Sequence, residues 1–168
     1  MKKKPVLTFI LLVLAQVFIC NFCNFTQFMM ITILPMAILF LPITQKPYVT
    51  MVIAFIAGFA VDFLADGMLG ITSLSLVPVA FTRLFLVRLI FGSEVIVRQE
   101  DISIHKHGIA DVLIIMLTAN LIFLTFYIWT DSAGMRPTWF NILKDGISLV
   151  ASTLVSMLLF PVLTSDGR

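Results

Sequence analysis

The residues best suited to chemistry in this sequence recur at a spacing of four within a long apolar stretch. Gly58, Asp62 and Asp66 lie four residues apart, so a helix places them on one face. An ionisable side chain inside a membrane costs about 2.5–3.5 kcal/mol on insertion scales, so each carboxylate should point to a neighbouring helix or a cavity. Gly67 and Gly70 follow and favour a turn. This pattern is typical of a packing and turn element, a partner-binding surface, or a ligand or proton site.

A lone arginine, Arg83, stands in the next apolar stretch, and its depth decides which carboxylate it can meet. At a rise of about 1.5 Å per residue, Arg83 and Asp62 differ in height by about 15 Å, which is too far for a direct bridge. We expect Arg83 to pair with Asp111 or to extend its side chain toward the inner surface. Lys144 is level with Asp62 and Asp66, and we expect a pairing at this height, with Asp62 as the partner to test.

Polar side chains also recur along the last apolar stretch, at spacings of three and four that place them on one helix face. Serines in such a stripe usually bond to their own helix backbone or join neighbouring helices, and we favour this packing interpretation. The lining of a ligand cavity is the alternative. The stripe consists of Asn141, Asp145, Ser148, Ser152 and Ser156.

Two cysteines and two histidines have spacings that a metal site could use, but each pair lacks further ligands. Cys20 and Cys23 are interpreted as ordinary helix-end residues, with a local disulfide as the alternative. His105 and His107 are assigned to a solvated inner loop. The sequence therefore predicts no bound metal and no cofactor.

Composition shows which elements must position these residues. Hydrophobic residues make up 60% of the 168 positions and charged residues 12%, whereas a soluble domain is usually about 45–50% apolar and about 25% charged. These values exclude an ordinary soluble domain, a disordered chain and a disulfide-rich secreted module. The net charge of +2 is too small for a nucleic-acid-binding protein. The chain therefore belongs in a membrane.

Five long runs carry no charged residue, and a membrane-spanning helix needs about 20 apolar residues. The first run, residues 5–45, has room for two spans and each of the others for one. The sequence thus predicts an all-α integral membrane protein, a single transmembrane domain over residues 1–168 built as a bundle of six transmembrane helices. A kink is expected at Pro35. The expected helices cover residues 5–21, 28–43, 48–65, 70–90, 108–130 and 141–163.

Lysine and arginine set the expected orientation, because they are enriched in cytoplasmic loops. Most of them, beginning with the cluster at residues 2–4, fall on the side of the N-terminus, whereas Arg136 and Lys144 fall on the other side. Both termini are therefore expected to be cytoplasmic. The first apolar stretch is expected to stay in place as a transmembrane helix, since no small-residue cleavage site follows it. Residues 94–107 would lie on the inner membrane surface or meet a cytoplasmic partner.

Membrane proteases are the enzyme class that such a composition could support, but their motifs are incomplete here. A serine protease needs a serine and a histidine within the membrane, whereas both histidines fall in a loop. A two-aspartate protease needs facing carboxylates, for which Asp62 and Asp145 are the candidates. The residues beside them, Phe63 and Lys144, do not fit the motifs of lipoprotein signal peptidases. We expect no enzymatic activity.

One motif in the sequence matches a known family. It combines two aspartates and three glycines with an arginine in the next helix: Gly58, Asp62, Asp66, Gly67, Gly70 and Arg83. A short six-span chain with this motif resembles the rod shape-determining protein MreD family. The hydropathy layout matches over nearly the whole chain, and the motif lies within residues 58–83.

The resemblance implies a non-catalytic protein of the bacterial cytoplasmic (inner) membrane that binds the membrane-anchored scaffold MreC. With MreC it would support the elongation complex that inserts side-wall peptidoglycan and controls cell shape. That complex includes actin-like MreB, a membrane glycosyltransferase and a transpeptidase. The second hypothesis is a substrate-binding subunit of an energy-coupling-factor vitamin transporter, whose helical architecture the family shares. Such subunits often carry an Ala-x-x-x-Ala pair in the first helix, where this chain has only Ala15.

Overall fold

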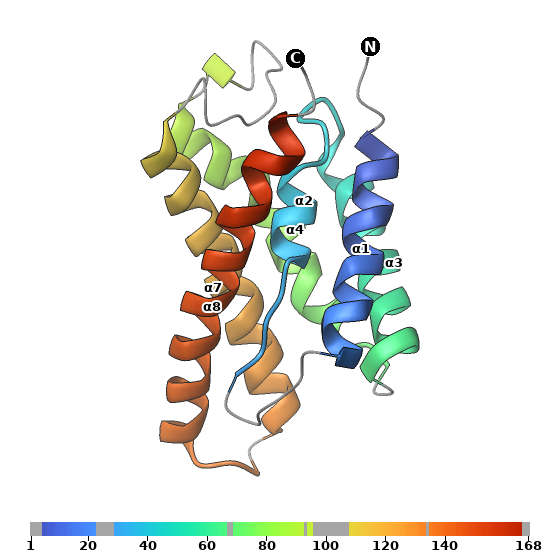
Figure 1. The fold of residues 1–168 in the computed structure, drawn as a ribbon, viewed down its shortest axis with the longest axis vertical. Coiled ribbons are helices and arrows are strands. Elements are labelled where there is room, and N and C mark those ends of the chain that lie inside the picture. The colour runs from blue at the N-terminus through green and yellow to red at the C-terminus, as the bar shows by residue number, and fades with distance from the viewer. Residues whose placement is uncertain are drawn as a thin grey trace.

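The computed structural model describes residues 5–22, 29–66, 69–92, 94–95, 108–133 and 135–165, and the regular elements among them are helical. Four helical stretches are long and apolar enough to cross a membrane, and α1 is a shorter apolar helix. Length and hydropathy together mark the chain as a multi-pass membrane protein. In chain order the elements are α1 (Pro5–Phe22), α2 (Leu34–Leu39), α3 (Pro47–Val61), the π-helical turn η1 (Asp62–Asp66), α4 (Ile71–Phe91), α7 (Ile109–Ser132) and α8 (Thr138–Ser165) (Figure 1).

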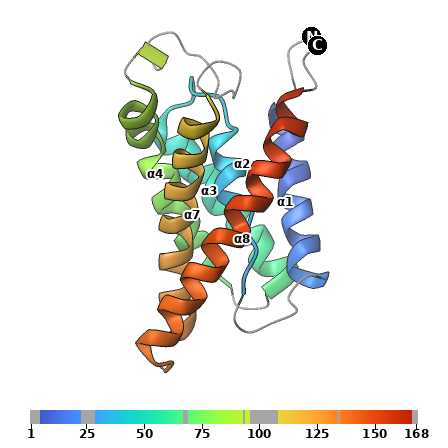
Figure 2. The same cartoon turned by 60° about the vertical axis from the view of Figure 1, so that its left-hand side comes forward.

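The long helices lie along the long axis of the bundle and alternate in direction (Figure 1, Figure 2). The most extensive packing joins α3 with α4, α4 with α7, and α7 with α8. The start of α1 and the end of α8 lie at the same end of the bundle, as two termini on one side of a membrane require (Figure 1). Helices are present where the sequence predicts the first, third, fourth, fifth and sixth spans, with ends displaced by a few residues.

The predicted second helix, over residues 28–43, is wrong. Met29–Ile33 form a drawn-out stretch without helical turns, and only the six residues of α2 follow as a helix (Figure 1). Pro35 lies in the first turn of α2, where its missing N–H is tolerated. One turn earlier, a helix would bring the Pro35 ring against the Ile31 carbonyl and leave that carbonyl without a donor. The expected bundle of six spanning helices therefore fails at its second member.

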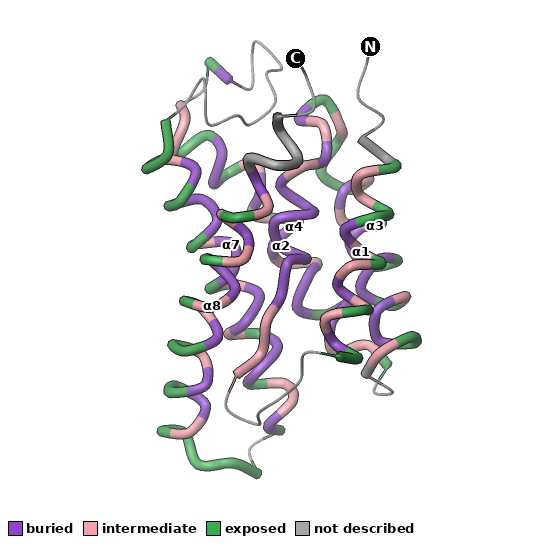
Figure 3. Tube along the Cα trace, viewed as in Figure 1, coloured by how far each residue is buried: buried purple, intermediate pink, exposed green. Residues whose placement is uncertain are grey.

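Residues Met29–Leu41, here called the central segment, occupy the middle of the bundle (Figure 3). All residues from Ile33 to Leu39 are buried, and α2 packs against α1, α4 and α7. The outward faces of the long helices are apolar as well, with Phe63, Phe81 and Leu158 each more than half exposed. An apolar exterior around a buried core that also contains polar groups is the arrangement that lipid, rather than water, requires.

Candidate functional site

Asp62 joins the end of α3 to the start of α4. Its carboxylate is fully buried and accepts hydrogen bonds from three backbone amides. Oδ2 accepts from Gly70 N–H at 2.8 Å and from Ser73 N–H at 3.4 Å, and Oδ1 accepts from Thr72 N–H at 3.1 Å. The first amides of a helix lack intrahelical partners and carry partial positive charge, so a carboxylate stabilises them. Asp62 thus caps α4 from the preceding helix.

Gly58 lets the backbones of α3 and α4 touch. A Cβ atom at this position would lie 2.6 Å from Ser73 Cα and 2.7 Å from Ser73 N, closer than packed atoms approach. The Ser73 hydroxyl donates to the Phe55 carbonyl at 3.2 Å across the same contact. Gly70, with φ at +101°, makes the turn in a conformation that favours glycine. Gly58, Asp62 and Gly70 therefore build the α3–α4 hairpin.

The other members of the predicted motif divide between the described and undescribed parts of the chain. The backbone of Asp66 ends η1, whereas its side chain lies outside the described residues, as does the whole of Gly67. The predicted helix-end cysteine Cys23 and the loop histidines His105 and His107 also lie outside the described residues. Among the residues that the structure describes, no group of three or more histidine, cysteine or acidic side chains could hold a metal ion.

The described contacts of Arg83 join it to the central segment. Its side chain is buried, and its guanidinium donates to the carbonyls of Leu39, at 3.4 Å, and of Leu41. These carbonyls lie at the end of α2, where helix carbonyls lack intrahelical donors and attract a cation. The predicted pairing with Asp111 is wrong, since no ion pair joins the two among the described residues, and the buried side chain does not extend to the surface. The end of α2 supplies acceptors for its guanidinium instead.

Lys144 does not meet Asp62, contrary to the sequence prediction. Its Nζ lies 3.7 Å from Asp131 Oδ2, which also accepts from Arg136 Nη1 at 3.1 Å. The three charged groups gather where α7 leads into α8. The carboxylate of Asp62 is instead occupied by the amides of α4.

The non-helical part of the central segment is bonded to α1 along one edge. Ile33 N–H donates to Gln16 Oε1 at 2.7 Å, and Gln16 Nε2 donates to the Ile31 carbonyl at 3.2 Å. Gln16 is fully buried, and its Nε2 also lies 3.1 Å from Cys20 Sγ. Ile31 is the residue whose carbonyl loses its helical donor because of Pro35. The side chain of Gln16 replaces that donor.

The opposite edge of the same stretch is bonded to α8. Met30 N–H donates to Ser148 Oγ at 2.9 Å and Thr32 N–H donates to Ser152 Oγ at 3.0 Å. Ser152 Oγ in turn lies 3.3 Å from the Met30 carbonyl. In hydrocarbon each unpaired backbone group would cost several kcal/mol, so these side chains allow the chain to pass through the bundle without a helix. This part of the α8 stripe packs against the central segment.

Gln16 is the residue that sequence reasoning missed. The one glutamine within the apolar residues 5–22, together with Pro35 downstream, was the available signal. Two more members of the α8 stripe bond to α7: Asn141 donates to Ser132 at 2.9 Å, and Asp145 accepts from Thr125 at 3.3 Å. The last member, Ser156, has a buried hydroxyl without a hydrogen-bond partner among the described residues. These contacts match the packing interpretation of the stripe.

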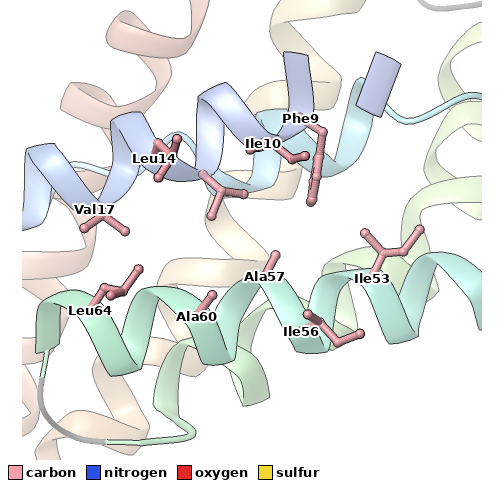
Figure 4. A pocket seen from close by; sticks show the side chains of 10 residues that line it. Phe9, Ile10, Leu14, Val17, Ile53, Ile56, Ala57, Ala60 and Leu64 are labelled. Carbon is pink, nitrogen blue, oxygen red and sulfur yellow. The ribbon is translucent and has the colours of Figure 1, made fainter. Parts of the chain in front are cut away.

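An apolar groove with a volume of about 290 Å³ lies between α1 and the α3–η1 helix (Figure 4). Side chains of the two helices face each other across it (Figure 4). Its α1 wall begins about 6 Å from one end of that helix and ends about 8 Å from the other, so the groove lies at mid-depth. The groove is lined by Phe9, Ile10, Val13, Leu14, Val17, Ile53, Ile56, Ala57, Ala60 and Leu64.

This lining decides what the groove can bind. Every lining residue is apolar, so the groove offers no side-chain hydrogen bond or charge to a ligand. It suits hydrocarbon, whether from side chains of another helix or from lipid. Protein-family models, curated proteins and solved structures give no match to this chain.

Proposed function

We propose that this protein is a non-catalytic membrane scaffold that receives one transmembrane helix of a membrane-anchored partner in the groove between α1 and α3. The apolar groove at mid-depth is the observation that carries the proposal. In line with the sequence resemblance, the partner is an MreC-type scaffold. The chain then serves the bacterial cell-elongation machinery in the inner membrane, which supports side-wall peptidoglycan synthesis together with MreB, a glycosyltransferase and a transpeptidase.

The shape of the groove favours a helix as its occupant. Ala57 and Ala60 lie one turn apart on α3 between the larger Ile53, Ile56 and Leu64. Small residues on a helix face let the backbone of a second helix approach closely, and close packing drives helix association where no hydrophobic effect acts. The larger neighbours would fix the height of the incoming helix.

The motif around Asp62 supports the same proposal by building one wall of the groove. Asp62 and Gly58 hold α3 against α4, so that the opposite face of α3 is presented to α1. The π-helical turn η1 continues this face, and its Leu64 lines the groove. π-Turns within α-helices are rare and frequently mark functional sites.

The buried charged groups support a role other than catalysis because they are used in the fold. Asp62 bonds to the start of α4, and Arg83 bonds to the end of α2. A charged side chain that caps a helix is not available for a proton-transfer role without breaking the cap. The proposed mechanism is therefore binding between helix faces.

A binding experiment tests the proposal. The tagged protein, co-expressed in membranes with a single-span MreC-type partner, should co-purify with that partner. Ala60→Leu fills the groove and should weaken co-purification about tenfold, the scale of a modest overpacking penalty. Ala110→Leu, on the exposed start of α7, is the matched control and should bind normally.

Two outcomes would contradict the proposal. Equal partner binding by the Ala60→Leu and Ala110→Leu variants would remove the groove from the interface. Tight vitamin binding by the purified protein without any cell-wall partner would favour the transporter-subunit alternative.

A further inference from the structure

We infer that Gln16 is a positioning residue that holds the α1 wall of the groove at its distance from α3. An effect of Gln16 on partner binding rests on the proposed function. The position of α1 relative to α3 can be measured in the isolated protein without it. Gln16 points away from the groove and contacts the central segment, whereas Val13, Leu14 and Val17 of the same helix line the groove. The residue therefore acts on the site through the placement of its helix.

The two hydrogen bonds of Gln16 specify both the rotation and the height of α1. One goes to a carbonyl and the other comes from an amide two residues later, on the same edge of the backbone. A single bond would allow α1 to turn about the bonded atom. Two bonds through one planar amide group restrict that rotation, and they lie in a dry interior where an alternative partner from water is lacking.

The central segment can act as the anchor because it is itself held from other directions. Ser148 and Ser152 of α8 bond to its opposite edge, and Arg83 of α4 bonds to two carbonyls at the end of α2. Contacts thus run without a break from α8 through the central segment and Gln16 to α1. A small cluster of apolar side chains, from Leu12, Ile33 and Ala37, packs at the same contact, and hydrocarbon side chains form no hydrogen bonds.

Few other contacts would keep α1 and α3 apart. The packing of α1 on α3 is slight compared with the packing of α3 on α4. The groove between them is closed neither by larger side chains nor by a polar bridge, since all its lining is apolar. Without the Gln16 bonds, α1 is expected to move into the groove and pack on Ala57 and Ala60.

Disulfide formation across the groove measures this movement. Val17→Cys and Leu64→Cys place thiols on side chains that lie opposite each other (Figure 4). Cys20→Ser and Cys23→Ser remove the native thiols, and serine at position 20 keeps an acceptor near Gln16. In this background Gln16→Met, which keeps the length of the side chain but not its bonds, should speed disulfide formation about tenfold.

Asn21→Leu is the matched control, because Asn21 is an exposed amide of α1 that donates only to the Val17 carbonyl of its own helix, at 3.0 Å, among the described contacts. It should leave the rate unchanged. If Gln16→Met does not accumulate in the membrane, Ser152→Ala loosens the same anchor from its other edge and should act in the same direction. A rate in either variant equal to that of the control would overturn the inference.

The outcome is separable from that of the proposed function. The cross-linking rate is measured on the isolated protein and needs no partner. Loss of partner binding by Ala60→Leu without a change of rate in Gln16→Met would refute the role of Gln16 alone. A faster rate in Gln16→Met with no partner bound by any variant would refute the proposed function alone.

Discussion

The side-chain amide of Gln16 bonds to the backbone around Ile33 as a residue of a parallel strand would. It accepts from Ile33 N–H at 2.7 Å and donates to the carbonyl two residues earlier at 3.2 Å. A glutamine thereby supplies the backbone partners that a helix would otherwise have provided. The contacts of the buried residues, this one among them, have three consequences for stability that can be measured in detergent or in lipid nanodiscs.

The first consequence links Gln16 to Pro35. Gln16→Met leaves two buried backbone groups unpaired and should lower the free energy of unfolding by about 1–3 kcal/mol. Pro35→Ala restores an N–H that can donate to the Ile31 carbonyl, so in that background Gln16→Met should cost about 1 kcal/mol less. A double-mutant cycle on unfolding free energies gives the coupling. Strictly additive effects would mean that the proline and the glutamine act independently.

The second consequence concerns the two helices that meet at Gly58. Gly58→Ala adds a methyl group against the backbone of Ser73 and should destabilise the protein by about 1–3 kcal/mol. Gly146→Ala, in α8, is the control, because an added Cβ there meets no atom within 4 Å. It should stabilise by about 0.5–1 kcal/mol through helix propensity. Thermal unfolding distinguishes the two, and equal shifts would contradict the close approach of α3 and α4.

The third consequence separates the two interpretations of Arg83. Arg83→Met removes the donor to the Leu39 and Leu41 carbonyls and should destabilise by about 1–3 kcal/mol. Asp111→Asn should change stability by less than about 0.5 kcal/mol, since the arginine does not depend on that carboxylate. Denaturant unfolding measures both. A large loss of stability in Asp111→Asn would instead support the ion pair that the sequence predicts.

Local features of the sequence predicted much of the fold. The apolar runs and the gaps in charge located α3, α4, α7 and α8, because the length of an apolar run is a property of the chain alone. The spacing of Gly58 and Asp62 correctly placed them on one helix face. Pro35 was recognised as a disturbance, but a kink was expected where the helix does not form. Helix propensity and hydropathy contain no information on whether a side chain from another helix can replace lost backbone hydrogen bonds.

The partners of the buried polar groups were not predictable in the same way. Depth along two helices suggested Asp111 for Arg83 and Lys144 for Asp62. Both were wrong among the described residues, where Asp62 accepts from backbone amides and Arg83 donates to backbone carbonyls. Depth is a one-dimensional measure, and it ignores the amides and carbonyls that helix ends expose. The pairing of Gln16 with the central segment had no counterpart in the sequence interpretation.

The sequence by itself determined that this chain enters a membrane and where its long helices run, because both follow from apolar length. It also determined that the second span would be disturbed, because proline lacks the N–H that a helix needs. Only the tertiary structure decided how that span is stabilised. Thr32 bonds to Ser152, 120 residues away, and Ile33 bonds to Gln16, 17 residues away. Such contacts depend on how helices distant in sequence pack together, and no local pattern records that.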